Sequence, residues 1–121
     1  MNTEQIAQRL VELCREGKGG EAQDELYSED AVSIEMEGAQ GIGNAKGIEA
    51  IREKGRQFNA MIEEMHGGTV GDPIVTGNWF ALVMTLDVTM KGRGRVNMQE
   101  ICVYQVRGGK IVREQFFYDL G

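Results

Sequence analysis

Apolar and polar residues alternate along three runs in the second half of the chain, at positions 80–90, 96–106 and 111–118. Alternation with a period of two is typical of strands that bury one face. The apolar side of these runs also carries Glu100 and Glu114, and an ionised carboxylate without partners is costly to bury. The pattern therefore predicts a sheet that wraps around a pocket.

The first half of the chain has helical spacing instead. The apolar residues from position 6 to 14 fall on one helix face, which Asn2 or Thr3 can cap and which the following glycines end. A shorter helix is predicted over 21–27. A third helix is marked by apolar residues at helical spacing, namely Ile48, Ile51, Phe58 and Ile62.

A strand is predicted at 31–36, between the second and third helices, with Glu35 on one of its two faces. A Gly-rich loop follows over 38–47. Its Gly41 and Gly43 form a GxG triplet, but the strand-turn-helix context and the further glycine of a dinucleotide fingerprint are missing. The triplet is therefore interpreted as local flexibility.

Turn residues at 67–68, 71–73, 77–78, 91–95 and 108–109 delimit the strands after Met65. They predict four antiparallel strands in meander order. Helices followed by a hairpin-connected sheet are typical of the α+β class, in which helices cover one face of a strongly curved, mainly antiparallel sheet. The 121 residues suffice for one domain, over 1–121.

The two faces of the predicted sheet differ in character. The even-numbered residues are mostly apolar and are expected to face the helices. The odd-numbered residues mix polar groups with large apolar ones, which favours either a homodimer interface or a merely amphipathic outer face. The large apolar residues of this odd set include Trp79, Ile101, Val103 and Phe117.

Composition excludes several classes of function. The net charge of -6 and pI near 4.8 disfavour nucleic-acid binding, and the one basic cluster, at 91–95, is expected to be a solvated turn. The N-terminal residues lack an apolar signal-peptide core and no membrane span is predicted, so a cytoplasmic location is expected. Cys14 and Cys102 are expected to be buried thiols, and a single histidine, His66, disfavours a metal site.

Three segments carry a resemblance to a known family. They are LYSEDAVSIE at 26–35, GIEAIR at 47–52 and GGKIVREQFFY at 108–118. With the order of elements, they make the chain resemble the cone-shaped α+β fold named for nuclear transport factor 2, and more narrowly its SnoaL-like group. The resemblance implies the fold strongly and the reaction weakly, because that superfamily includes isomerases, cyclases, hydratases, transport factors and proteins without known activity.

Ketosteroid isomerase, a relative within this superfamily, uses a carboxylate base and two hydrogen-bond donors for an oxyanion. Alignment with that family places Glu35 where its aspartate base stands. The same alignment places Val11 at the position of the oxyanion tyrosine, and alignment of the last hairpin places Cys102 at that of the protonated aspartic acid. The resemblance thus implies a carboxylate able to move a proton, without the familiar donors.

Glu35 and Glu100 are the predicted proton-transfer groups, and His66 could shuttle protons with a neighbouring glutamate. Desolvation or mutual repulsion with Glu114 would raise the pKa of at least one carboxyl. Asp87 and Asp119 are weaker candidates for catalysis, because their odd numbers place them on the outer face of the sheet unless a β-bulge intervenes. The predicted substrate-binding residues are Glu114, Tyr118, Phe116, Met84, Met98, Cys102 and Tyr104.

Each of these residues also has a structural interpretation: the acids as paired or capping groups, the tyrosines and methionines as packing. The leading hypothesis is a homodimeric SnoaL-like protein that binds a small, largely apolar molecule and acts as an isomerase-like or cyclase-like proton-transfer enzyme, without cofactor or metal. The alternatives are a ligand-binding module without chemistry and an interaction protein that uses its outer sheet face.

Overall fold

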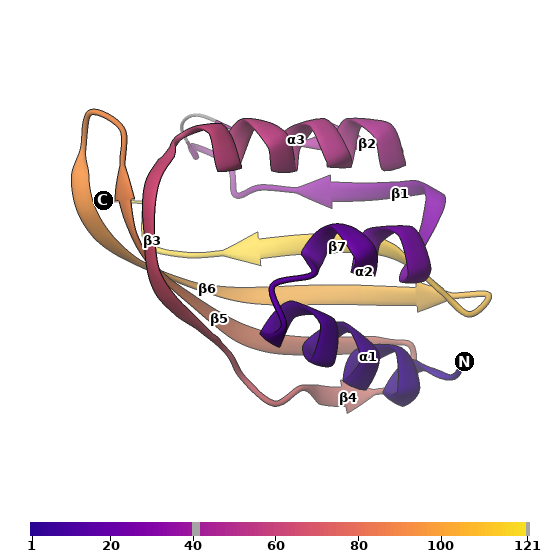
Figure 1. Ribbon diagram of the computed structural model, residues 1–121. Helices are drawn as coiled ribbons and strands as arrows, with labels where there is room; N and C mark the ends of the chain where they lie inside the picture. Colours follow the sequence, from indigo (N-terminus) through magenta and orange to yellow (C-terminus); the bar gives the residue numbers. More distant parts are fainter. Residues whose placement is uncertain (40–41, 121) are drawn as a thin grey trace.

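The computed structural model describes residues 1–39 and 42–120, so Gly41 of the predicted GxG triplet lies outside the described residues. Three helices pack on a curved sheet (Figure 1). The fold is α+β, as predicted from the sequence. The elements are α1 (Thr3–Arg15), α2 (Gly19–Leu26), β1 (Tyr27–Ile34), β2 (Ala45–Lys46), α3 (Ile48–Ala60), β3 (Ile62–Val70), β4 (Ile74–Thr76), β5 (Trp79–Met90), β6 (Gly94–Arg107) and β7 (Lys110–Phe117).

The sheet is mixed but mostly antiparallel. Its strand order is β2-β1-β7-β6-β5-β3, and the short β4 pairs with the same strand β5 that β3 joins. Among the strands that the structure describes, only β1 and β7 run parallel, with Ser33 opposite Glu114 and Ile34 opposite Gln115. This pairing brings the first strand of the chain beside the last (Figure 1). It therefore places the candidate acid after β1 next to those of the C-terminal strands.

Helix α1 begins where the sequence predicted. Asn2 caps it through a reciprocal pair of hydrogen bonds: the Gln5 backbone N–H donates to Asn2 Oδ1 at 2.8 Å, and the Asn2 backbone N–H donates to Gln5 Oε1 at 2.9 Å. Its apolar face, which includes Ile6 and Leu10, is fully buried. At its other end, Arg15 donates to the carbonyl oxygen of Val70 at 2.7 Å, which fixes the helix to β3.

Strands β5 and β6 confirm the predicted alternation. They pair without a register shift from Trp79 opposite Gln105 to Met90 opposite Gly94. Their even-numbered residues are buried or half-buried under the helices, whereas Val83 and Ile101 are each 49% exposed on the outer face. We call the helix-covered side the inner face of the sheet and the other side the convex face.

Several β-strand predictions were wrong, including the bounds of the first strand, which is Tyr27–Ile34 instead of 31–36. Strand β3 continues through Gly67 and Gly68, which were expected to interrupt it, and β4 is a separate strand, so five strands follow α3 instead of four. In β7, Val106 pairs with Ile111 but Gln105 pairs with Arg113, so Val112 is an extra residue in a β-bulge. The bulge places Ile111 in the core, in the position that parity had assigned to Val112.

The core lies between the helices and the inner face of the sheet. Ile6, Leu26, Ile51 and Phe80 are among its fully buried side chains. Cys102 is also buried there and Cys14 is half-buried, and both are free thiols, as expected. Over residues 1–39 and 42–120, none of the helices combines the length and the apolar character that crossing a membrane requires.

Candidate functional site

A cluster of polar side chains interrupts the inner face of the sheet near the ends of β1 and β7. Ser33 is completely buried in β1, and Glu35 follows that strand. Because β1 and β7 are parallel neighbours, Glu114 lies beside Ser33, and Tyr118 follows β7 at the same end as Glu35. Helix α3, which packs against β1, adds Lys54.

Lys54 and Glu35 form a shielded ion pair in this cluster. Lys54 Nζ lies 2.6 Å from Glu35 Oε2, and both side chains are only 13% exposed. Lys54 also donates to Ser33 Oγ at 2.8 Å. The second Glu35 oxygen, Oε1, accepts a hydrogen bond of 2.6 Å from the Tyr118 hydroxyl. Both carboxylate oxygens of Glu35 are thus engaged, and the backbone N–H of Glu35 donates to Asn44 Oδ1 at 2.7 Å.

Glu114 is satisfied from within the fold. It is 6% exposed, and its Oε1 accepts a hydrogen bond from the Tyr27 hydroxyl. Burial raises the pKa of Glu114, while hydrogen bonds from Ser33 and Tyr27 act in the opposite direction. Burial also raises the pKa of Tyr27 well above its ordinary value, and the charge of Glu114 adds to this effect. These contacts favour the structural interpretation of Glu114.

Glu100 lies in a more apolar setting. On the inner face of β6 its neighbours are Met98 and Cys102, and Met84 is its partner on β5. Among the described residues, Glu100 accepts a long hydrogen bond of 3.5 Å from Cys102 Sγ on its Oε1 atom, and it takes part in no ion pair there. Burial raises the pKa of Glu100 to about 6, with further contributions from the negative charges of Glu35 and Glu114.

The thiol of Cys102 is suited to donate that bond, because burial raises its pKa and keeps it protonated. A carboxyl with a pKa near 6 exchanges its proton readily at neutral pH. The three glutamates therefore lie in the same part of the inner face, but their surroundings differ. Within the described part of the chain, no group of His, Cys, Asp and Glu side chains is arranged so that it could hold a metal ion.

The other predicted binding residues separate into two groups. Tyr104 and Cys102 are core residues, and the ring of Tyr104 stacks on Phe80 with centroids 4.7 Å apart. The second group of predicted binding residues is half-buried on the inner face and consists of Met84, Met98, Phe116 and Tyr118. Phe116 packs under Lys54, whose Nζ lies 5.3 Å from the ring centroid.

The structure does not bring His66 to the acids. His66 is the extra residue where the register of β3 and β5 shifts, between Met65 and Gly67. Its Nε2 lies 2.7 Å from Thr89 Oγ1, and Thr89 alternates with the buried Val88 and Met90, so this contact is on the convex face. The neighbouring glutamate of His66 is the exposed Glu64, at 3.7 Å, not one of the three inner acids.

Asp87 and Asp119 also lie outside the cluster. Asp87 is on the convex face, as parity predicted, and its carboxylate accepts hydrogen bonds of 2.9 and 3.0 Å from Arg95. These bonds lower the pKa of Asp87. Asp119 follows β7 and is exposed. Neither acid contributes to the inner face.

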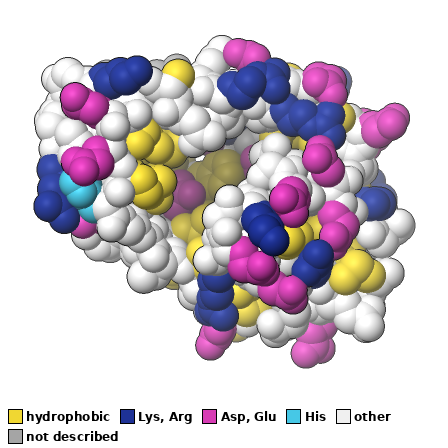
Figure 2. Space-filling model, in the orientation of Figure 1, with side chains coloured by type: hydrophobic (Ala, Val, Ile, Leu, Met, Phe, Trp, Pro, Cys, Tyr) yellow, Lys and Arg dark blue, Asp and Glu magenta, His cyan; other side chains and the backbone are white. Residues whose placement is uncertain are grey.

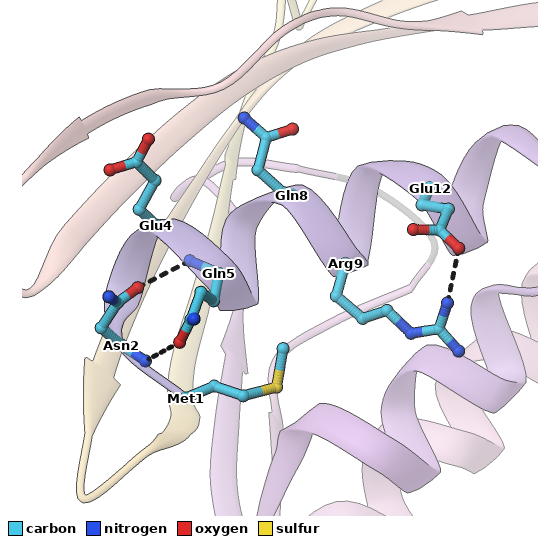
Figure 3. A pocket seen from close by; sticks show the side chains of 7 residues that line it. All are labelled: Met1, Asn2, Glu4, Gln5, Gln8, Arg9 and Glu12. Atoms are coloured by element: carbon cyan, nitrogen blue, oxygen red, sulfur yellow. Dashed lines mark hydrogen bonds and ion pairs between the residues drawn. The ribbon is translucent and has the colours of Figure 1, made fainter.

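The surface shows two kinds of depression. In Figure 2, the molecule is hollowed at the centre of the view, and hydrophobic side chains line this hollow around an acidic one. Figure 3 shows a different depression, on the outer side of α1, where polar side chains already contact one another, as Arg9 does with Glu12. The depression on α1 includes none of the predicted site residues.

Sequence reasoning missed Lys54, Ser33 and Tyr27. A signal for Lys54 was present, because it lies three residues after Ile51 and four before Phe58, on the apolar face of the predicted helix. Ser33 and Tyr27 gave no comparable signal, since their roles depend on the parallel pairing of β1 with β7. Val11, aligned with the oxyanion tyrosine, is a buried core residue.

Comparison with known proteins identifies the family of this chain. The family described as SnoaL-like domain matches residues 1–118. A crystal structure from Mesorhizobium loti, with the provisional description of a SnoaL-like polyketide cyclase, is 38% identical, with a TM-score of 0.89 and coverage of 98% of this chain and 100% of that one. No curated protein matches the chain.

More distant structures share the fold alone. A protein of unknown function from Burkholderia pseudomallei, described as like nuclear transport factor 2, is 16% identical, with a TM-score of 0.80 and coverage of 99% and 93% of the two chains. A protein from Catenulispora acidiphila with a ketosteroid isomerase-like fold is 20% identical, with a TM-score of 0.69 and coverage of 98% and 88%. The chain therefore belongs to the SnoaL-like domain family and has the α+β fold of its relatives.

Proposed function

We propose that this protein binds a small, largely apolar molecule in the hollow of Figure 2 and transfers a proton on it, as an isomerase or cyclase does. We define the site by the inner-face residues Glu100, Met84, Met98 and Phe116, together with the Lys54–Glu35 pair. The proposal rests mainly on the surroundings of Glu100. This carboxyl has a raised pKa, lies on an otherwise apolar surface and has no cationic partner among the described residues. Such a group is suited to general acid–base catalysis.

Glu100 rather than Glu35 is the proposed proton carrier. Each oxygen of Glu35 already accepts a hydrogen bond, from Lys54 or Tyr118, and these contacts hold the carboxylate in one orientation, whereas Oε2 of Glu100 accepts no hydrogen bond among the described residues. In the proposed step, the Glu100 carboxylate takes a proton from a carbon next to a carbonyl group. The C–H bond breaks, an O–H bond forms on Glu100, and the electron pair moves to the carbonyl oxygen as an enolate.

The second half of the reaction restores Glu100. The enolate carbon either takes the proton back at the same or a conjugated position, which is isomerisation, or attacks a second carbonyl carbon, which closes a ring. In the ring closure, the Glu100 acid protonates the new alkoxide, so the protons balance. The description of the Mesorhizobium loti relative as a cyclase supports the second outcome.

Hydrogen exchange on a simple ketone tests this proposal without the natural substrate. With β-tetralone in heavy water, the protein should accelerate deuterium incorporation next to the carbonyl by about 100-fold or more over buffer, the range of a positioned general base. Because the base is the ionised form, the rate should rise with pH through about 6. Mass spectrometry of the recovered ketone measures the rate.

Glu100→Gln should abolish this acceleration, while Glu63→Gln, at an exposed glutamate of β3, should leave it unchanged. Equal acceleration by wild type and Glu100→Gln would refute the assignment of Glu100.

A binding module without chemistry is the second candidate function. It is favoured by the two aligned positions at which the ketosteroid isomerase donors are absent, Val11 and Cys102. This alternative predicts that β-tetralone binds, and raises the melting temperature, without any exchange above the rate in buffer.

We also propose that the protein is a homodimer through the convex face. The support is an exposed apolar row across three strands, in which Val83 pairs with Ile101 and Ile101 pairs with Phe117, with Trp79 further along β5. An apolar patch of this extent on a sheet face is typical of protein interfaces. A cytoplasmic location stays a prediction from the sequence.

A further inference from the structure

Lys54 belongs to the proposed site but takes no part in the proton transfer by Glu100. It is a nearly buried cation on the inner side of α3, and its ammonium nitrogen is fixed from two directions. An ammonium group has three N–H donors. In residues 1–39 and 42–120, Lys54 has two hydrogen-bond acceptors, Ser33 Oγ and Glu35 Oε2, and its remaining contact is with the Phe116 ring. One N–H therefore has no hydrogen-bond acceptor among these residues.

The positive charge of Lys54 is already paired and fixed in position within the fold. Burying an ammonium requires a counter-charge, and Glu35 supplies it at 2.6 Å. Tyr118 binds the other oxygen of Glu35, so the carboxylate cannot rotate away without losing a hydrogen bond. A donor fixed in this way needs no rearrangement when negative charge develops beside it, which is how preorganised sites stabilise an oxyanion.

Lys54 and Glu100 are arranged on opposite sides of one apolar surface. Lys54 lies over Phe116, Phe116 pairs with Cys102 across β7 and β6, and Glu100 is two residues from Cys102 on the same face. With strand spacing of about 4.8 Å and about 6.6 Å between alternate residues, a molecule of one or two fused rings can reach both groups. The positive charge of Lys54 also acts on Glu100 and lowers its pKa.

We propose that Lys54 donates its remaining N–H to the carbonyl oxygen of the ligand, with Glu35 as the residue that positions it. The inference rests on the proposed function, because it names the group that receives the negative charge when Glu100 removes the proton. It also narrows the ligand to a carbonyl compound with an acidic C–H a few bonds from that oxygen. Lys54 would thus serve where the aligned oxyanion donors are missing.

A matched pair of probes isolates this contact. β-Tetralone and tetralin have the same two-ring carbon skeleton, but only the first has a carbonyl oxygen. Wild type should bind the ketone about tenfold or more tightly than the hydrocarbon, because a hydrogen bond from a charged donor contributes at least that much. Lys54→Met should remove this preference and leave the affinity for tetralin unchanged. Arg56→Met, on the exposed side of the same helix, is the control.

A second variant covers the case in which Lys54→Met does not fold. The double variant Glu35→Gln/Lys54→Met removes both charges together and should also lose the preference for the ketone. A readout that a purely structural role would not move is the carbonyl stretching frequency of bound β-tetralone: the hydrogen bond from Lys54 should lower it in wild type, and Lys54→Met should remove this shift.

The outcomes separate this inference from the proposed function. A ketone preference that persists in folded Lys54→Met, or in the double variant, would overturn the role of Lys54 while leaving exchange by Glu100 intact. Ketone preference that depends on Lys54, with no deuterium exchange, would support this role and contradict the proposed catalysis. Failure of both probes to bind wild type would overturn both.

Discussion

Glu35 and Glu100 are the same residue type in opposite surroundings. Glu35 has an ammonium group and a tyrosine hydroxyl on its two oxygens, whereas Glu100 has a single thiol contact and methionine neighbours. The first arrangement holds the Glu35 carboxylate in one orientation, whereas burial raises the pKa of Glu100. A division of this kind between nearby acids separates a group that orients from a group that exchanges protons.

The burial of Glu100 should lower the free energy of unfolding measurably when its carboxyl is ionised. Its pKa of about 6 exceeds the ordinary 4.5, so the folded chain binds this proton more tightly than the unfolded chain. The bound proton therefore stabilises the folded state fully below about pH 4.5, and this stabilisation is lost as pH rises through about 6. That difference corresponds to about 2 kcal/mol. Glu100→Gln should thus raise the free energy of unfolding by about 2 kcal/mol at about pH 8 and leave it nearly unchanged at about pH 4.

Urea denaturation at the two pH values measures this difference. A Glu100→Gln protein that is less stable than wild type at the higher pH would mean that the carboxylate is stabilised in the fold, contrary to this description of the site.

At the level of elements, β3 depends on a close approach to β5. A Cβ atom added at Gly68 would lie 2.7 Å from the backbone oxygen of Thr85, a contact that only a backbone shift can relieve. The adjacent Gly67 has open space at the same position. Gly68→Ala should therefore lower the free energy of unfolding by about 1–3 kcal/mol, the usual cost of overpacking.

Gly67→Ala is the matched control for Gly68→Ala and should change stability by less than about 0.5 kcal/mol. Denaturation curves of the two variants provide the comparison. Equal effects of the two substitutions would show that general strand preference, rather than the contact with Thr85, requires glycine at position 68.

The elements also show how far the sequence could predict the fold. Alternation identified β5 and β6 because both strands pair without interruption. It failed in β3, where glycine serves close packing instead of a turn, and at Val112, because a bulge inverts parity without a signal in the residue types. The acids of the inner face were identified as unusual, but their partners were not, because Lys54 meets Glu35 only when α3 packs on β1.

At the scale of the whole molecule, the two faces of the sheet differ in the side chains that they carry. The inner face holds the core and the polar cluster, and the convex face presents its apolar row to solvent. Light scattering should give the mass of two 13.4 kDa chains for wild type. Ile101→Glu, which places a charge in the middle of the row, should give the mass of one, because burying an unpaired carboxylate opposes association.

Gln8→Glu, which adds the same charge to an exposed position of α1, should remain a dimer. A wild-type protein with the mass of one chain at all concentrations would contradict the proposed interface.

A proton-exchanging carboxyl on an apolar inner face is the feature on which the proposed function of this protein depends most. Direct titration of the Glu100 side-chain carboxyl by carbon-detected NMR, with Glu100→Gln to assign its signal, tests this claim without a ligand. A midpoint near pH 6 is expected, clearly above the ordinary value of 4.5 for a glutamate. A midpoint at the ordinary value of 4.5 would show that Glu100 is solvated or paired, and would contradict the proposed role.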